Sequence, residues 1–247
     1  PYPIIDKNKK YINFINRKPS CLFSFIEGRS LNNFTQNSIQ NVGINLAKLH
    51  LITNNYTHQI KTRFDFDFFD NVIKKYEVYF LKHDISLIDI FKTILHDYKK
   101  LNSKDIPKGT IHGDLFPDNV LFNEKNQITG FLDFYFSDFN YLISDIAIVI
   151  ISWCFYLDNN NKYILDFDKI NILLKNYSKV RKIHSNEIDS LKLICKIYCM
   201  RFMFTRLIAQ NNDYDKNKIL RKNPNEYINK LLYFNNINNF RLSINYE

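Results

Sequence analysis

Acidic and amide side chains interrupt two apolar runs in the middle of the chain, and this pattern restricts the possible fold more than any other feature. Residues 109–138 read GTIHGDLFPDNVLFNEKNQITGFLDFYFSD. Segments 120–123 and 127–134 have the composition of buried strands and flank a short polar turn. We therefore predict a hairpin centred near Asn126.

Asn119 and Asp133 each lie seven residues from that centre. In such a hairpin they would face each other across the ladder, with Cα atoms about 4.5–5.5 Å apart. A carboxylate beside an amide oxygen suits Mg²⁺, which takes a few hard oxygen ligands and keeps water or phosphate at its other positions. The sequence therefore predicts a magnesium site at the open end of the hairpin.

A polar loop precedes the hairpin. His112 and Asp114 lie in it, and Pro117 interrupts the backbone, which keeps Asp114 out of regular structure. A carboxylate held there could accept a proton from an attacking hydroxyl, as phosphoryl transfer requires. Taken singly, Asp114 could cap a turn, His112 could be a core histidine and Asp133 could end a strand. Their spacing together favours a catalytic site.

The rest of the chain is mainly helical. Segments 11–15 and 20–26 resemble two strands, and a polar break follows at 27–30. We predict helices over 35–52, 67–81, 86–101, 144–156 with Ser144 as N-cap, 168–177, 185–211 and 224–234 with Asn223 as cap. This order predicts an α+β protein with a remnant of a β lobe at 1–27 and a helical lobe at 28–247.

Composition limits the partners only weakly. The 247 residues are 45% hydrophobic, enough for a substantial core, and carry a net charge of +9. The basic residues are mostly Lys, scattered singly or in pairs, which favours a solvated surface over nucleic-acid binding. The positive charge could still attract an anionic substrate such as a nucleotide.

Cysteine usage and hydropathy point to the cytoplasm. The four cysteines lie in apolar segments, as is typical of a reducing compartment. Cys195 and Cys199 could share a metal on one helix, but packed core thiols are the favoured interpretation. The most apolar run, 143–157, is too short to span a bilayer, so we expect no membrane partner.

Five segments, HGDLFPDNVLF, GFLDFYFS, SDIAIVIISWC, RFMFTRLIA and NPNEYINKLL, resemble in their order those of the type II homoserine kinases. That family belongs to the small-molecule branch of the protein-kinase-like fold, with the aminoglycoside phosphotransferases and choline kinases. The resemblance implies a mainly helical C-terminal lobe with a small catalytic hairpin. It also implies transfer of the γ-phosphoryl group of ATP to L-homoserine, with Mg²⁺, for threonine biosynthesis.

The resemblance also assigns roles to individual residues. It makes Asp114 the catalytic base and His112 the residue that braces its loop. Asn119 and Asp133 become Mg²⁺ ligands. Asp145 becomes a structural residue that holds the catalytic loop through its backbone amides, at the start of a helix.

The nucleotide side of the resemblance is incomplete. Phe23, Phe25 and Ile26 correspond to the hinge beside the adenine, and Gly28 with Arg29 would begin the helical lobe. No glycine-rich loop and no nucleotide-anchoring lysine precede this hinge. We therefore expect most of the N-terminal lobe to be missing from the chain, with doubtful activity for the chain alone.

The acceptor site is predicted from charge. Homoserine carries a carboxylate, and Arg201 lies on the side of its helix opposite Lys192 and Lys196, so Arg201 is the favoured carboxylate ligand. A core arginine paired with a carboxylate of the fold is the alternative. Arg206 is expected near the solvated side of the helix. Tyr135, which stands where protein kinases have Gly, and Asp138 follow the metal ligand and are placed to line the acceptor site.

Several functions remain open at this point. Another small-molecule kinase, for an aminoglycoside, choline or a sugar alcohol, would use the same catalytic residues. A truncated, non-catalytic kinase remnant would keep the fold without activity. Nucleic-acid binding is a more distant alternative, and the sequence does not predict the oligomeric state.

Overall fold

A computed structural model describes residues 1–56, 60–101, 105–211, 222–240 and 242. The α-helices are α1 (Gln36–Thr53), α2 (Phe66–Lys75), α3 (Glu77–His83), α4 (Leu87–Leu101), α5 (Ile143–Trp153), α6 (Phe167–Ser178), α7 (Ser185–Asn211) and α8 (Asn225–Asn236). The strands are β1 (Pro3–Ile4), β2 (Asn13–Ile15), β3 (Lys18–Ser20), β4 (Leu22–Phe23), β5 (Lys108–Ile111), β6 (Val120–Phe122), β7 (Ile128–Phe131), β8 (Asp138–Tyr141), β9 (Phe155–Leu157) and β10 (Tyr163–Leu165). They pair antiparallel in five two-stranded sheets.

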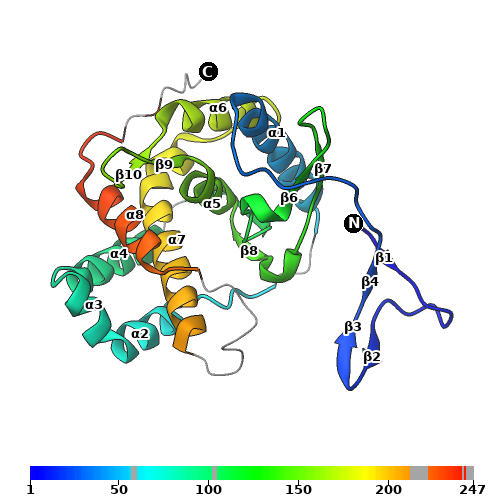
Figure 1. Cartoon of the computed structure of the whole chain (residues 1–247), viewed down its shortest axis with the longest axis horizontal. Helices are drawn as coiled ribbons and strands as arrows, with labels where there is room; N and C mark the ends of the chain where they lie inside the picture. The colour runs from blue at the N-terminus through cyan, green and yellow to red at the C-terminus, as the bar shows by residue number, and fades with distance from the viewer. Residues whose placement is uncertain (57–59, 102–104, 212–221, 241, 243–247) are drawn as a thin grey trace.

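The first four strands form an arm at one side of the helical body (Figure 1). β2 pairs with β3 through a tight turn at Asn16 and Arg17, whose φ values of 50° and 63° suit the twist of a two-residue hairpin. β1 pairs with β4. The predicted single strand over 20–26 is wrong, because pairing changes partner at Cys21 and ends at Phe23.

The first helix follows its sequence pattern closely. Thr35 caps α1 by accepting from the amide of Ser38 at 3.2 Å, and Ile39 and Leu46 lie on its buried face. Gly43 allows close approach to α6, since a Cβ there would meet the carbonyl oxygen of Leu173 at 2.6 Å. This contact fixes α1 against α6.

The centre of the body is α5, which packs against α7, while α7 also packs against α8 (Figure 1). Almost every residue of α5 is buried, Asp145 included. A helix that is apolar on all sides must be enclosed by others. The single charged side chain at its start therefore needs partners in the interior.

Three local predictions are wrong. The helix predicted over 67–81 is two helices, because Tyr76 leaves helical geometry at φ −115° and ψ 21°. Ser144 does not cap α5, which begins at Ile143 directly after β8. The end of the predicted helix 144–156 is instead the start of a hairpin between β9 and β10.

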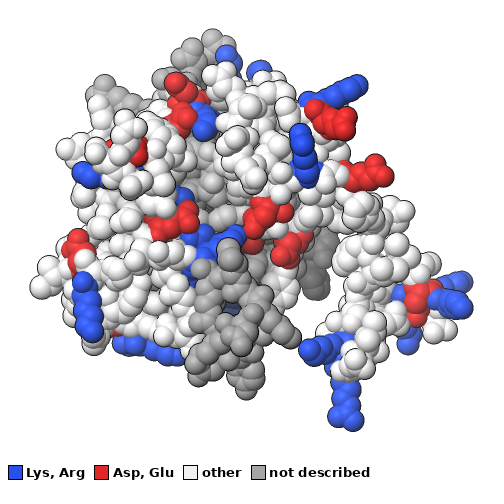
Figure 2. All heavy atoms as spheres, in the orientation of Figure 1, with Lys and Arg blue, Asp and Glu red and all other residues white. Residues whose placement is uncertain are grey.

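On the face in Figure 2, Lys and Arg side chains are interspersed with Asp and Glu side chains, and both kinds gather near its centre. Mixed charge of this kind produces a weaker long-range field than a single-sign patch. Among the helices of the described residues, none combines the length and the hydropathy that crossing a membrane requires.

Candidate active site

The polar loop predicted from the sequence lies between β5 and β6 and is closed by the short 3₁₀ helix Pro117–Asn119. β5 pairs with β8 so that Ile111 stands opposite Asp138, which brings His112 and Gly113 beside the segment before β8. Gly113 has φ +77°, and a Cβ there would overlap the carbonyl oxygen of Phe136. Glycine is therefore required both by the backbone conformation and by the close approach.

Asp145 holds this loop from the interior. Its carboxylate accepts the amide N–H of His112 at 2.7 Å and that of Gly113 at 2.9 Å. The Nε2 of His50 lies 3.0 Å from the same carboxylate. Burial alone would raise the pKa of Asp145, but the hydrogen bonds from His50 and from the loop amides outweigh it and hold the pKa below its ordinary value. Asp145 thus accepts from two consecutive backbone amides of the loop.

A buried chain of polar groups continues behind Asp145. Tyr177 Oη lies 2.6 Å from Nδ1 of His50, and Arg181 donates to Tyr177 at 3.2 Å. Arg181 is also paired with Glu187 at 3.0 Å. Since Arg181 donates to the Tyr177 oxygen, the hydroxyl hydrogen points to His50, whose Nε2–H then points to Asp145. The network fixes His50 in the tautomer that supports the loop.

His112 braces the loop through both ring nitrogens. Its Nδ1 accepts the amide of Asp114 at 3.2 Å, and its Nε2 lies 2.8 Å from the carbonyl oxygen of Leu132. These partners require the Nε2–H tautomer. His112 therefore joins the loop to the hairpin.

The carboxylate of Asp114 is half-buried and is held by Asn119. The Asn119 amide donates to the Asp114 carbonyl at 2.7 Å and to its Oδ2 at 3.3 Å. Burial raises the pKa of Asp114 above its ordinary value, and the positive charge of Arg201 opposes that shift. A carboxylate with a raised pKa is better suited to accept a proton.

The hairpin register differs from the prediction. Val120 pairs with Phe131, and the carbonyl of Asn119 accepts the amide of Leu132 at 2.9 Å, so Asn119 stands opposite Leu132 rather than Asp133. The ladder shifts between Leu121 and Phe122, because a bulge adds one residue on the β7 side. The turn itself is centred at Lys125, one residue before the predicted centre, and the bulge reduces this offset to half a residue at Asn119.

Asp133 nevertheless reaches the same site. It lies two residues after β7 in a left-handed conformation, φ 58° and ψ 65°, and its side chain accepts from the amide of Tyr135 at 3.4 Å. A cavity of about 210 Å³ brings the predicted catalytic and metal-binding residues together. Its lining residues are Asp114, Phe116, Asp118, Asn119, Asp133, Phe202, Arg206 and Lys222.

The donor set of this cavity fits Mg²⁺. Asn119 uses its amide nitrogen toward Asp114, which leaves its oxygen for a ligand, and Asp133 is exposed. Among the described residues, no three His, Cys, Asp or Glu side chains form a metal cluster. Two protein oxygens are sufficient for Mg²⁺ when substrate phosphates and water complete its coordination.

Arg201 does not line this cavity. Its side chain lies behind the loop, 4% exposed, and donates to the carbonyl oxygen of Gly113. Its guanidinium lies 4.1 Å from the ring centre of Phe64 and 4.7 Å from that of Phe202. Burial lowers its pKa, and nearby negative charge opposes this. Arg201 therefore supports the catalytic loop from within the core.

Arg206 is the arginine that lines the cavity. The sequence placed it near the solvated side, but its side chain is only 12% exposed. It pairs with Glu226 at 2.6 Å and donates to the carbonyl of Asn223 at 2.9 Å. The sequence predicted no role for Glu226 or Lys222, because both lie near the start of the last helix and reach Arg206 or the cavity only through the tertiary fold.

The other predicted acceptor residues lie outside the cavity lining. Tyr135 is 65% exposed, and Arg63 stacks over its ring at 4.2 Å. Asp138 is buried in β8, where burial raises its pKa, and its Oδ1 has no hydrogen-bond partner among the described residues. Neither residue lines the cavity that contains Asp114.

The predicted hinge residues are mostly exposed. Phe25 is 90% exposed and Phe23 is exposed as well, whereas Ile26 is half-buried beside Gly130 of the hairpin. Arg29 joins the hairpin through two backbone hydrogen bonds with Phe122, both 2.9 Å long. A cavity of about 430 Å³ adjoins this junction. It is lined by Glu27, Gly28, Arg29, Phe122, Asn123, Glu124 and Thr129.

Cys195 and Cys199 are fully buried in α7. Burial raises the pKa of both thiols, as expected for packed core residues.

Comparison with known proteins identifies the family. The model of the phosphotransferase enzyme family matches residues 10–168. The homoserine kinase of Bartonella tribocorum is 30% identical over 241 residues, which cover 96% of this chain and 73% of that protein. The homoserine kinase of Rhizobium meliloti is 29% identical over 233 residues, covering 94% of this chain and 70% of that protein.

Solved structures share the fold at low sequence identity. An amicoumacin kinase in complex with AMP-PNP, Ca²⁺ and Ami has a TM-score of 0.65 at 15% identity, covering 94% of this chain and 69% of that one. The GDP complex of aminoglycoside 2'-phosphotransferase-IIIa has a TM-score of 0.63 at 16% identity, covering 92% and 75%. The fold is thus the predicted kinase-like α+β fold. With the family match over residues 10–168, the chain belongs to the phosphotransferase enzyme family and is an ATP-dependent kinase.

Proposed function

We propose that this kinase transfers the γ-phosphoryl group of ATP to the hydroxyl of L-homoserine and forms O-phospho-L-homoserine. The observation that carries the proposal is the single cavity in which Asp114, Asn119 and Asp133 meet a cationic side chain, Arg206. The homoserine kinases similar over nearly the whole chain support this acceptor.

In this proposal Asp114 is the catalytic base. The acceptor oxygen forms a bond to the γ-phosphorus, the bond to the β–γ bridging oxygen breaks, and ADP leaves with that oxygen. The hydroxyl proton passes to the Asp114 carboxylate, which Asn119 holds in position. Asn119 and Asp133 would hold Mg²⁺, which when bound neutralises charge on the phosphates.

A panel of acceptors tests the proposal. L-homoserine, choline, kanamycin and a sugar alcohol are compared by ADP release, with the product identified by ³¹P NMR. We expect the highest kcat/KM for L-homoserine. A higher value for another acceptor would identify the protein as a different small-molecule kinase. If no acceptor of the panel caused ADP release, a non-catalytic remnant would be favoured.

Removing the Asp133 carboxylate should raise the Mg²⁺ requirement. We expect Asp133→Asn to increase the Mg²⁺ concentration for half-maximal activity about 10- to 100-fold, because one anionic oxygen ligand becomes a neutral one. Mg²⁺ titration of the initial rate measures this. Asp97→Asn, an exposed change on α4, is the matched control. An unchanged Mg²⁺ requirement in Asp133→Asn contradicts the ligand assignment.

The activity should also depend on the ionisation of Asp114. Because burial raises the pKa of Asp114 above its ordinary value of 3.8, the acidic limb of kcat/KM should lie above pH 3.8, with activity lost as the pH falls through it. Arg201→Met removes the positive charge that opposes this shift, so the limb should move to higher pH. A limb that stays in place or moves to lower pH in Arg201→Met argues against Asp114 as the titrating base.

A further inference from the structure

Two described cationic side chains, Arg206 and Lys222, line the cavity that contains Asp114. They differ in how much of their positive charge is balanced by neighbouring carboxylates. Lys222 is exposed and pairs with Asp118 at 3.0 Å, so one positive charge meets one negative charge. Arg206 shares Glu226 with Lys230, which lies 2.5 Å from the same carboxylate. Two cations and one anion leave this cluster with a net positive charge, at one side of a cavity that also contains Asp114 and Asp133.

The Glu226 cluster is charged and largely withdrawn from solvent. Burial alone would raise the pKa of Glu226, but Lys230 and Arg206 outweigh it and hold the pKa below its ordinary value. Lys230 is buried and also donates to the carbonyl of Ile151 at 2.8 Å. Glu226 is therefore an ionised anchor between two cations.

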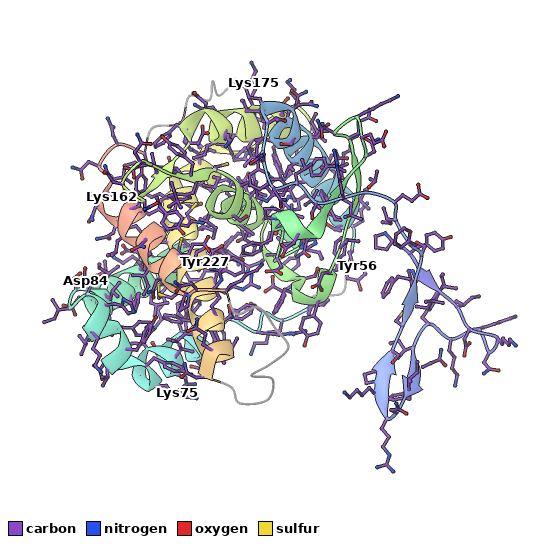
Figure 3. All side chains as sticks on the ribbon, viewed as in Figure 1. Tyr56, Lys75, Asp84, Lys162, Lys175 and Tyr227 are labelled. Carbon is purple, nitrogen blue, oxygen red and sulfur yellow. The ribbon has the colours of Figure 1, made fainter. Side chains whose placement is uncertain are left out.

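The Arg206 guanidinium is held in one orientation. Among the described residues, its hydrogen bonds to Glu226 and to the carbonyl of Asn223 both start from Nη1. The guanidinium also lies 4.5 Å from the ring centre of Tyr227, a fully buried residue on the inner side of α8 (Figure 3). Within the part of the chain that the structure describes, Nε and Nη2 have no hydrogen-bond partner, and this edge of the guanidinium matches the two oxygens of a carboxylate.

Arg206 lies one turn beyond Phe202, and both side chains line the cavity from α7. Phe202 packs edge to face against Phe116 of the catalytic loop, with ring centres 4.7 Å apart. This contact joins the helix that carries the cation to the loop that carries Asp114. An acceptor with a hydroxyl at one end and a carboxylate at the other can therefore use both residues from one cavity.

We propose that Arg206, oriented by Glu226, binds the carboxylate of the acceptor and makes the enzyme selective for an amino-acid alcohol over a simple alcohol. This inference rests on the proposed homoserine kinase function. It replaces Arg201, the residue favoured by the sequence, with Arg206, because Arg201 is engaged with Gly113 and buried among aromatic rings.

Two acceptors test the role of the carboxylate. L-homoserine is compared with 3-aminopropan-1-ol, which lacks only the carboxylate, by initial rates and by saturation-transfer NMR binding. In Arg206→Gln we expect kcat/KM for L-homoserine to fall about 10- to 100-fold, mainly through KM, since a charge-assisted contact is lost. The value for 3-aminopropan-1-ol should change less than about 3-fold, as expected for an acceptor that lacks the group Arg206 binds.

Companion variants separate binding from folding. Arg206→Lys keeps the charge but loses the planar fork and should show an intermediate loss for L-homoserine. Lys196→Gln removes a different cation of α7, which donates to Asn235 and does not line the cavity. This variant should keep the wild-type preference for L-homoserine over 3-aminopropan-1-ol. Glu226→Gln should raise KM for L-homoserine more than it lowers kcat, because it releases the orientation of Arg206.

The outcomes are distinguishable. Equal losses with both acceptors in Arg206→Gln would assign Arg206 a purely structural role and overturn the inference, while leaving the homoserine kinase proposal intact. If Lys222→Gln, and not Arg206→Gln, lost the preference for L-homoserine, the carboxylate would be assigned to Lys222. That result would also overturn the inference. A wild-type protein that neither binds nor phosphorylates L-homoserine would overturn the proposed function, and this inference with it.

Discussion

Asp114→Asn is expected to lower kcat by roughly 10²–10⁴-fold, the usual contribution of a positioned general base. The amide has nearly the same shape and can still accept from Asn119, so the loop should remain folded. It cannot take the hydroxyl proton. Nucleotide affinity should change less than about 3-fold, because the loss acts on the transition state rather than on ground-state binding.

Steady-state kinetics and equilibrium binding of an ATP analogue measure the two effects separately. Asp97→Asn is the matched control, since it makes the same change at an exposed carboxylate on α4 that does not line the cavity. Turnover near the wild-type rate in Asp114→Asn would remove Asp114 from the mechanism. A parallel loss of kcat and nucleotide affinity would point instead to a distorted loop.

Elements with a strong period in the sequence were predictable. The buried face of α1, with Ile39 and Leu46, and both ends of α7 follow the helical spacing of apolar residues. The hairpin was predictable because alternating strand residues flank a polar turn. These patterns depend on local chemistry, which a sequence displays directly.

Features set by longer-range contacts were not predictable in the same way. The turn between β6 and β7 is centred at Lys125 rather than Asn126, and the bulge compensates only in part, so that Asn119 faces Leu132 instead of Asp133. Ser144 has the composition of a cap, yet β8 leads directly into α5 and places it inside the first turn.

The two arginines of α7 show the same limit at the site. Helical spacing correctly separated Arg201 from the Lys192 and Lys196 face, but burial alone does not distinguish a ligand-binding arginine from one that supports a loop. Arg206 was expected near the solvent because its ion-pair partner Glu226 comes from the far end of the chain. Such a partner is visible only once α8 is in place.

Asp145→Asn is expected to cost about 3–5 kcal/mol of unfolding free energy, because each buried donor left without an acceptor costs about 1–3 kcal/mol. The Asp145 carboxylate is fully buried and accepts from the amides of His112 and Gly113 and from His50. An asparagine in its place would turn its amide N–H toward one of these N–H groups. Both of the facing N–H groups would then lack an acceptor. For a domain of this size the melting temperature should fall by roughly 10 °C.

Thermal and urea unfolding measure this loss, with Asp70→Asn, an exposed change on α2, as the control. Because the pKa of Asp145 is held below its ordinary value of 3.8, its stabilising contribution should be present above about pH 3.8 and disappear as the pH falls through the lower folded value. The difference between wild type and Asp145→Asn should therefore be constant near neutral pH and shrink in acid. A melting temperature no lower than that of Asp70→Asn would mean that the catalytic loop is held by Arg201 and His112 without Asp145.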